Sequence, residues 1–148
     1  MSRSKALVAG SVVAVVVLSA SAALAKPLSE QQWRKQGNAV CKQVNKELDA
    51  LGNEIFAGLG PHDQPSVEQV QAFAEQFAPV IKDAIASIDA LKEPAALKKD
   101  VKRFKAAAND AVAHVEANPS VLLNEKSDPF AKVNKIARKL GLKVCANG

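Results

Sequence analysis

Two cysteines are the residues of this chain whose chemistry is easiest to foresee. Cys41 and Cys145 are its only thiols. A disulfide between them would close a loop of about 100 residues and stabilise the fold by roughly 4–5 kcal/mol in the chain-entropy model. The alternatives are a redox-active pair or metal ligands, but there is no C-x-x-C motif and two distant thiols make a poor metal site. We therefore expect a structural disulfide between the first helix and the C-terminus.

The two histidines are the other candidate ligands. His62 stands beside Asp63, which could orient its ring towards a metal or a haem; the alternative is a solvated loop histidine. His114 lies beside the apolar stripe of the third helix; it could reach a ligand from there, or be a histidine at the edge of that stripe with water or a carbonyl as partner. No nucleophile elbow, phosphate loop or metalloprotease motif occurs, and neither histidine follows a glutamate by three positions, as di-metal bundle sites require. We expect no enzyme activity, no catalytic residue, no metal and no cofactor, with haem as the alternative.

Phe77 is a third candidate ligand-binding residue. Aromatic side chains at helical spacing usually pack in a core. Pro79, two positions further on, should kink its helix, and a kink there could open a small apolar cavity between helices.

A group of basic residues forms a candidate binding surface. Its members are Lys98, Lys99, Lys102, Arg103 and Lys105, with Asp100 as the one acid among them. They could contact an anionic polymer or lipid headgroups. The alternative is a solvated face that acids on other helices balance.

Four amphipathic helices must position these residues, because apolar residues recur every three or four positions and no strand-like alternation occurs. The first two helices begin at capping boxes, Ser29 with Gln32 and Ser66 with Gln69. The third begins at Glu93-Pro94 and the fourth at Asp128-Pro129, after a connector over 119–127 that contains a turn of helix. The pattern predicts an all-α fold, an antiparallel four-helix bundle closed by one disulfide.

The first 25 residues have the pattern of a secretory signal peptide. Arg3 and Lys5 precede an uncharged apolar stretch, and Ala23-Leu24-Ala25 supplies the small residues that signal peptidase needs. We expect cleavage after Ala25, with an uncleaved membrane anchor as the alternative, and one helical domain over residues 26–148. The net charge, +5 over the chain and +3 without Arg3 and Lys5, does not indicate nucleic acid as a partner.

Two segments carry a resemblance to known exported proteins. They are Leu28-Ser29…Trp33…Gly37-Asn38-Ala39-Val40-Cys41…Asn45 and Asp128-Pro129-Phe130…Ala137…Gly141-Leu142-Lys143-Val144-Cys145. Together they resemble a family of small exported actinobacterial helical proteins, many of them lipoproteins of unknown function. The resemblance covers most of residues 26–148 and implies a helical fold outside the cytoplasm, without an activity. The residue directly after the predicted cleavage site is Lys26 and not a cysteine, so lipid attachment there is not implied.

A second, shorter resemblance is to mycobacterial haemophores. The segment that carries it is Val115-Glu116-Ala117-Asn118-Pro119-Ser120-Val121. Such proteins use histidine and tyrosine around the haem. This chain has no tyrosine, so the resemblance leaves only His62 and His114 for that role.

Taken together, these patterns predict a monomeric, exported, non-catalytic protein of the cell envelope or the extracellular space. It would bind a small apolar ligand between its helices or a partner in the envelope. The alternatives are a structural or interaction protein without a ligand, and a haem carrier.

Overall fold

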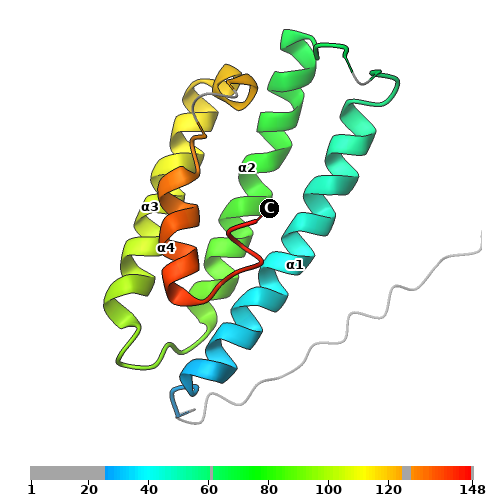
Figure 1. The fold of residues 1–148 in the computed structure, drawn as a ribbon. Helices are drawn as coiled ribbons and strands as arrows, with labels where there is room; N and C mark the ends of the chain where they lie inside the picture. The colour runs from blue at the N-terminus through cyan, green and yellow to red at the C-terminus, as the bar shows by residue number, and fades with distance from the viewer. Residues whose placement is uncertain (1–25, 61, 125–127, 148) are drawn as a thin grey trace, which may run out of the picture.

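The fold is all-helical, as predicted, in a computed structural model that describes residues 26–60, 62–124 and 128–147. The helices are α1 (Glu30–Ile55), α2 (Val67–Ala90), α3 (Lys98–Ala117) and α4 (Ala131–Leu140), with the 3-10 helix η1 (Pro119–Leu123) between α3 and α4 (Figure 1). No strand occurs in these ranges. The predicted signal peptide over residues 1–25, Pro61 in the first connection and residues 125–127 of the connector lie outside the described residues.

Each helix lies beside the next one along the chain, because the chain turns back at every connection (Figure 1). α4 has only 10 residues, against 26 in α1. After α4 the chain turns at Gly141, whose φ of 79° is the left-handed conformation that favours glycine, and the segment 142–147 returns along α1. No helix in the described part of the chain is long and apolar enough to span a membrane.

Both predicted capping boxes are present. The Ser29 hydroxyl accepts from the backbone N–H of Gln32 at 3.2 Å, and the Gln32 side chain accepts from the backbone N–H of Ser29 at 3.1 Å. Ser66 and Gln69 make the same pair of bonds at 3.2 and 2.9 Å. Gln69 also donates to the carbonyl of Ile55 at 3.0 Å, so the start of α2 satisfies an orphan carbonyl at the end of α1.

The start of α2 also favours an acidic side chain. Hydrogen bonds from the backbone and then from the Ser66 side chain hold the pKa of the exposed Glu68 carboxyl below its ordinary value. Pro79 lies inside α2, which continues through it as one helix.

Two predicted helix starts were wrong by a few residues. α3 begins at Lys98 and not at Pro94, because the N–H groups of Leu97 and Lys98 bond to carbonyls three positions back and close a tighter turn first. α4 begins at Ala131, because Asp128 instead caps the turn that precedes it, accepting from the backbone N–H of Phe130 at 2.7 Å.

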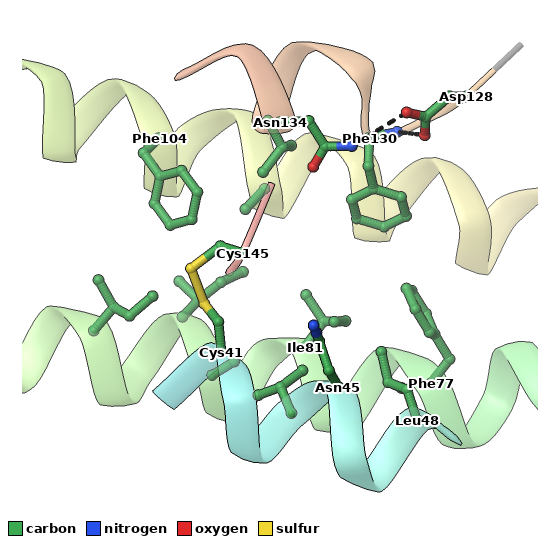
Figure 2. A pocket seen from close by; sticks show the side chains of 16 residues that line it. Cys41, Asn45, Leu48, Phe77, Ile81, Phe104, Asp128, Phe130, Asn134 and Cys145 are labelled. Atoms are coloured by element: carbon green, nitrogen blue, oxygen red, sulfur yellow. Dashed lines mark hydrogen bonds between the residues drawn. A yellow bond between two sulfur atoms is a disulfide. The ribbon is translucent and has the colours of Figure 1, made fainter. Parts of the chain in front are cut away.

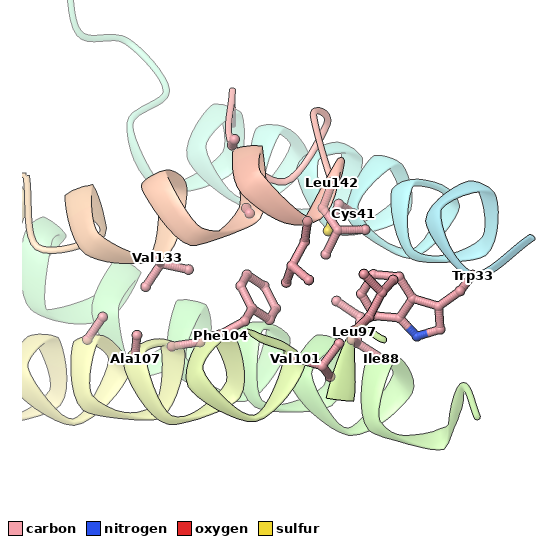
Figure 3. Close-up of a cluster of buried hydrophobic side chains, with 14 residues drawn as sticks. Trp33, Cys41, Ile88, Leu97, Val101, Phe104, Ala107, Val133 and Leu142 are labelled. Atoms are coloured by element: carbon pink, nitrogen blue, oxygen red, sulfur yellow. The ribbon is translucent and has the colours of Figure 1, made fainter. Parts of the chain in front are cut away.

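The larger core cluster joins all four α-helices and the C-terminal segment (Figure 3). Trp33 and Leu142 are fully buried in it, and Phe104 extends into it from α3. A smaller cluster around Phe77 packs α2 against α3. No polar or charged residue is buried anywhere in the described ranges, so apolar packing holds the helices together.

Gly37 is where the C-terminal segment approaches α1 most closely, and this close approach makes a testable prediction. A Cβ at Gly37 would lie 2.6 Å from Leu142 Cδ2, and Leu142 has no exposed surface into which it could move. We expect Gly37→Ala to lower the free energy of unfolding by about 1–3 kcal/mol.

The matched control is Gly52→Ala in the same helix, where the nearest atom, in the Phe73 ring, is 4.0 Å away. There the gain in helix propensity should stabilise by about 0.5–1 kcal/mol. Urea denaturation measures both, and an equal effect of the two substitutions would contradict the close packing.

Candidate functional site

A cavity of about 250 Å³ lies between the helices (Figure 2). Side chains from all four α-helices and the C-terminal segment line it. They are Cys41, Val44, Asn45, Leu48, Phe77, Ile81, Ala84, Ile85, Ile88, Phe104, Ala108, Asp128, Phe130, Val133, Asn134 and Cys145.

The walls of the cavity are mainly hydrocarbon. Phe77 and Phe130 face each other edge to face, with ring centroids 5.5 Å apart, at one end of it (Figure 2). Asn45, Asn134 and Asp128 supply the polar side chains. Asp128 is the only exposed residue of the lining, and its carboxylate accepts from the Asn134 amide at 3.2 Å. We therefore place the mouth of the cavity at Asp128.

The disulfide forms part of the cavity wall. Cys41 and Cys145 are joined in the structure, with Cα atoms 5.0 Å apart, as the sequence predicted. Cys41 is nearly fully buried. The pair therefore fixes the C-terminal segment across the helices at the point where it borders the cavity.

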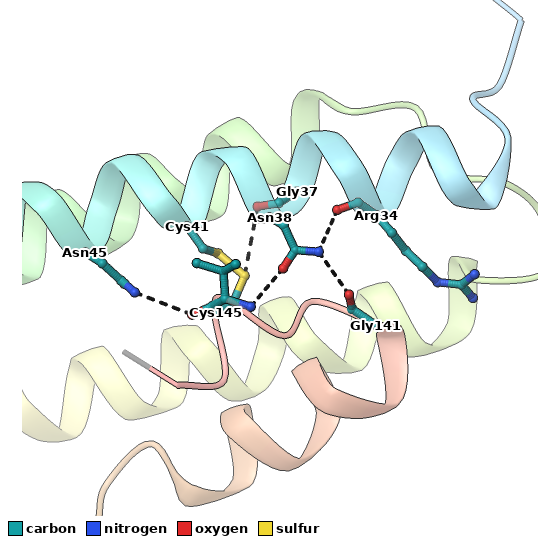
Figure 4. Close-up of a disulfide and its surroundings, with 8 residues drawn as sticks. Arg34, Gly37, Asn38, Cys41, Asn45, Gly141 and Cys145 are labelled. Carbon is teal, nitrogen blue, oxygen red and sulfur yellow. Dashed lines mark hydrogen bonds between the residues drawn. A yellow bond between two sulfur atoms is a disulfide. The ribbon is translucent and has the colours of Figure 1, made fainter.

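Asn38 holds the same segment through its amide, one turn before Cys41 (Figure 4). Its Nδ2 donates to the carbonyls of Arg34 at 2.8 Å and Gly141 at 3.0 Å, and its Oδ1 accepts from the backbone N–H of Val144 at 2.8 Å. Arg34 Nε donates to the carbonyl of Leu140 at 2.9 Å. Sequence reasoning missed this role of Asn38. The available signal was a polar residue beside the buried stripe, one turn from a cysteine.

The three predicted ligand-binding residues are not brought together. Phe77 lines the cavity, whereas His62 lies exposed in the α1–α2 connection and His114 lies exposed in the last turn of α3. Neither histidine borders the cavity. Within the described ranges, no group of three or more histidine, cysteine, aspartate or glutamate side chains is placed to hold a metal ion.

The predicted basic surface divides into two parts. Lys98, Lys99, Lys102 and Arg103 are exposed on α3. Lys105 is half-buried and forms an ion pair with Asp89 of α2. Arg103 instead belongs with three lysines of α4, which sequence reasoning did not include although their spacing of three and four marks one helix face: Lys132, Lys135 and Lys139.

No protein-family model, no curated protein and no solved structure matches this chain. The function proposed for it therefore rests on the cavity and on the chemistry of the residues around it.

Proposed function

We propose that residues 26–148 are an exported antiparallel four-helix bundle that binds a small apolar ligand without catalysis. The observation that carries this proposal is the cavity of about 250 Å³ whose apolar walls come from all four helices. Binding sites in helical bundles typically lie between facing helices in this way.

The volume sets the size of the ligand. An apolar cavity of about 150 Å³ holds one benzene molecule, so about 250 Å³ accommodates roughly ten non-hydrogen atoms. A compact aromatic or branched aliphatic molecule has this size. A haem does not fit into such a volume, and the cavity offers no histidine to ligate its iron.

The lining sets the polarity of the ligand. A polar molecule would need hydrogen-bond partners in the interior, and none of the buried residues provides a polar side chain. The Asn134 amide is bonded to Asp128. A ligand with one polar group would therefore direct that group towards the mouth at Asp128 and bury the rest against Phe77.

The disulfide supports a location outside the cytoplasm. Disulfides persist in oxidising compartments and are rare where thiols are kept reduced. Together with the signal-peptide pattern over residues 1–25, the Cys41–Cys145 bond favours a protein that meets its ligand in the envelope or the medium.

Naphthalene, with ten carbons, is a suitable probe of the cavity. We expect saturable binding that raises the melting temperature of residues 26–148. Ala84→Leu fills part of the cavity and should weaken this binding at least tenfold, because the larger side chain occupies volume that naphthalene needs. Ala86→Leu is the matched control, because Ala86 is exposed on the same helix outside the cavity. Equal naphthalene affinity in the two variants would exclude the cavity as the binding site.

Native mass spectrometry of the protein from an exporting host would identify the natural ligand. A co-purifying adduct that Ala84→Leu removes and Ala86→Leu retains would support the carrier role and give the mass of the ligand. An adduct that persists in both variants would place binding elsewhere.

A second candidate function is an interaction protein without a ligand. Its support is the exposure of two large apolar side chains, Val67 at 75% and Leu123 at 43%, around a shallow hollow where α2 begins beside η1. Exposed apolar surface of this kind can mark a protein contact. In that case Val67→Asp would abolish self-association or partner binding, and naphthalene would not bind in the cavity.

A further inference from the structure

A groove separate from the cavity runs between α3 and α4, which lie side by side (Figure 1). It has a volume of about 670 Å³, is open to solvent, and shares no lining residue with the cavity. Arg103 borders it from α3, and Lys132, Lys135 and Lys139 border it from α4. Its apolar lining residues, called its floor below, are Ala106, Ala107 and Ile136.

The positive charge of the groove is only partly neutralised. Asp100 contacts Lys139 at 2.9 Å and Arg103 at 3.9 Å. Lys132 and Lys135 have no acidic partner within the described part of the chain. One end of the groove therefore carries an ion-paired carboxylate, and the other end carries two uncompensated ammonium groups.

The surface between these charges is apolar. Ile136 is half-buried and Ala107 is buried, and long basic side chains lay their methylene stems along such a surface while their charges stay in water. A simple polyanion would contact the ammonium groups and leave this floor uncovered. The combination instead fits a molecule with one anionic end and one hydrocarbon end.

We propose that the α3/α4 groove binds a monomeric anionic amphiphile. Its head, a phosphate or a carboxylate, lies between Lys132 and Lys135, whose spacing of three positions places their side chains on one helix face where one anion can bridge both. Its alkyl chain lies over Ile136 and Ala107 towards Arg103. This site is independent of the proposed cavity ligand.

Dodecyl phosphate below its micelle concentration tests the head-group contacts. We expect Lys132→Gln/Lys135→Gln to weaken its binding by about tenfold, as measured by calorimetric titration. The matched control, Lys98→Gln/Lys99→Gln, removes the same charge from exposed positions of α3 outside the groove and should change affinity less than about twofold. An equal loss of dodecyl phosphate affinity in the two variants would contradict the proposed site. It would indicate instead a diffuse attraction of the anion to a basic protein. Dodecanoate in the same titration shows whether a carboxylate head binds as well.

The floor is tested separately. Ala106→Glu puts a carboxylate on the groove at an exposed position, where the fold tolerates it, and Ile136→Gln removes apolar contact. Both substitutions should weaken the binding of dodecyl phosphate by about fivefold or more.

Two outcomes would overturn the proposal. One is tight binding of linear polyphosphate that Ile136→Gln does not change, which indicates a polyanion site. The other is binding to phosphatidylglycerol vesicles without binding of monomeric dodecyl phosphate, which indicates a membrane-facing surface.

Discussion

Replacing both Cys41 and Cys145 with alanine is expected to lower the free energy of unfolding by about 4–5 kcal/mol. The bond links residues 104 positions apart, so its loss releases nearly the whole domain from a closed loop in the unfolded state. For a domain of this size, this is a large part of the total stability. Urea unfolding of the oxidised protein and of the double-alanine variant, followed by far-UV circular dichroism, measures the difference.

The hydrogen bonds of the Asn38 amide lead to a second prediction, which the same unfolding experiment measures. It anchors Gly141 and Val144 without help from the disulfide, so the C-terminal segment should stay on α1 in the folded double-alanine variant. Adding Asn38→Ala in that background should cost a further amount of about 1–3 kcal/mol, because it leaves the Val144 N–H without its partner. Asn45→Ala is the control, because the Asn45 amide reaches the Val144 carbonyl only at 3.4 Å. A reduced wild-type protein within about 1 kcal/mol of the oxidised one would show that the Asn38 contacts and the packing of Leu142 hold the segment without the disulfide.

The disulfide also connects stability with the proposed function. Both sulfur-bearing residues line the cavity, and the segment between Gly141 and Asn147 closes the space that the short α4 leaves beside α1. A protein without the bond should therefore bind naphthalene more weakly than the oxidised protein. This effect would distinguish a disulfide that shapes a binding site from one that only stabilises a fold.

The helices and the disulfide could be predicted because their signals are local or involve few candidate residues. A capping box lies within four residues, and the chain has only two cysteines that could pair. The starts of α3 and α4 were misplaced because proline permits both a first helical turn and the tighter turn that precedes these helices. Backbone bonds at Leu97 and the Asp128 side chain decide between the two, and neither is visible in the periodicity.

The sites were less predictable because they depend on contacts between distant segments. Phe77 lines the cavity, but so do Asn45, Phe130 and both cysteines, which the sequence did not bring together with it. The basic residues of α3 were grouped by their proximity in the sequence. Packing instead joins Arg103 to the lysines of α4 and turns Lys105 towards Asp89.

Trp33→Ala is expected to cost about 3–5 kcal/mol, as large-to-small substitutions of buried aromatic residues do. Trp33 has no exposed surface and packs with Ile88, Leu97 and Val101 where three helices meet (Figure 3). Few neighbours there can move to fill the space, because they are themselves nearly fully buried. Far-UV circular dichroism must follow the urea unfolding, since the substitution removes the only tryptophan.

Trp33→Phe should cost much less than its lost volume suggests. The indole Nε1 is buried without a hydrogen-bond partner in the described part of the chain, and an unsatisfied buried donor costs about 1–3 kcal/mol. Phenylalanine removes that donor, and this gain offsets part of the lost packing. Phe104→Ala in the same cluster is the reference for packing loss without a polar group. If Trp33→Phe destabilised as much as Trp33→Ala, the indole N–H would have a partner in solution. The start of α1 would then depend on a polar contact as well as on packing.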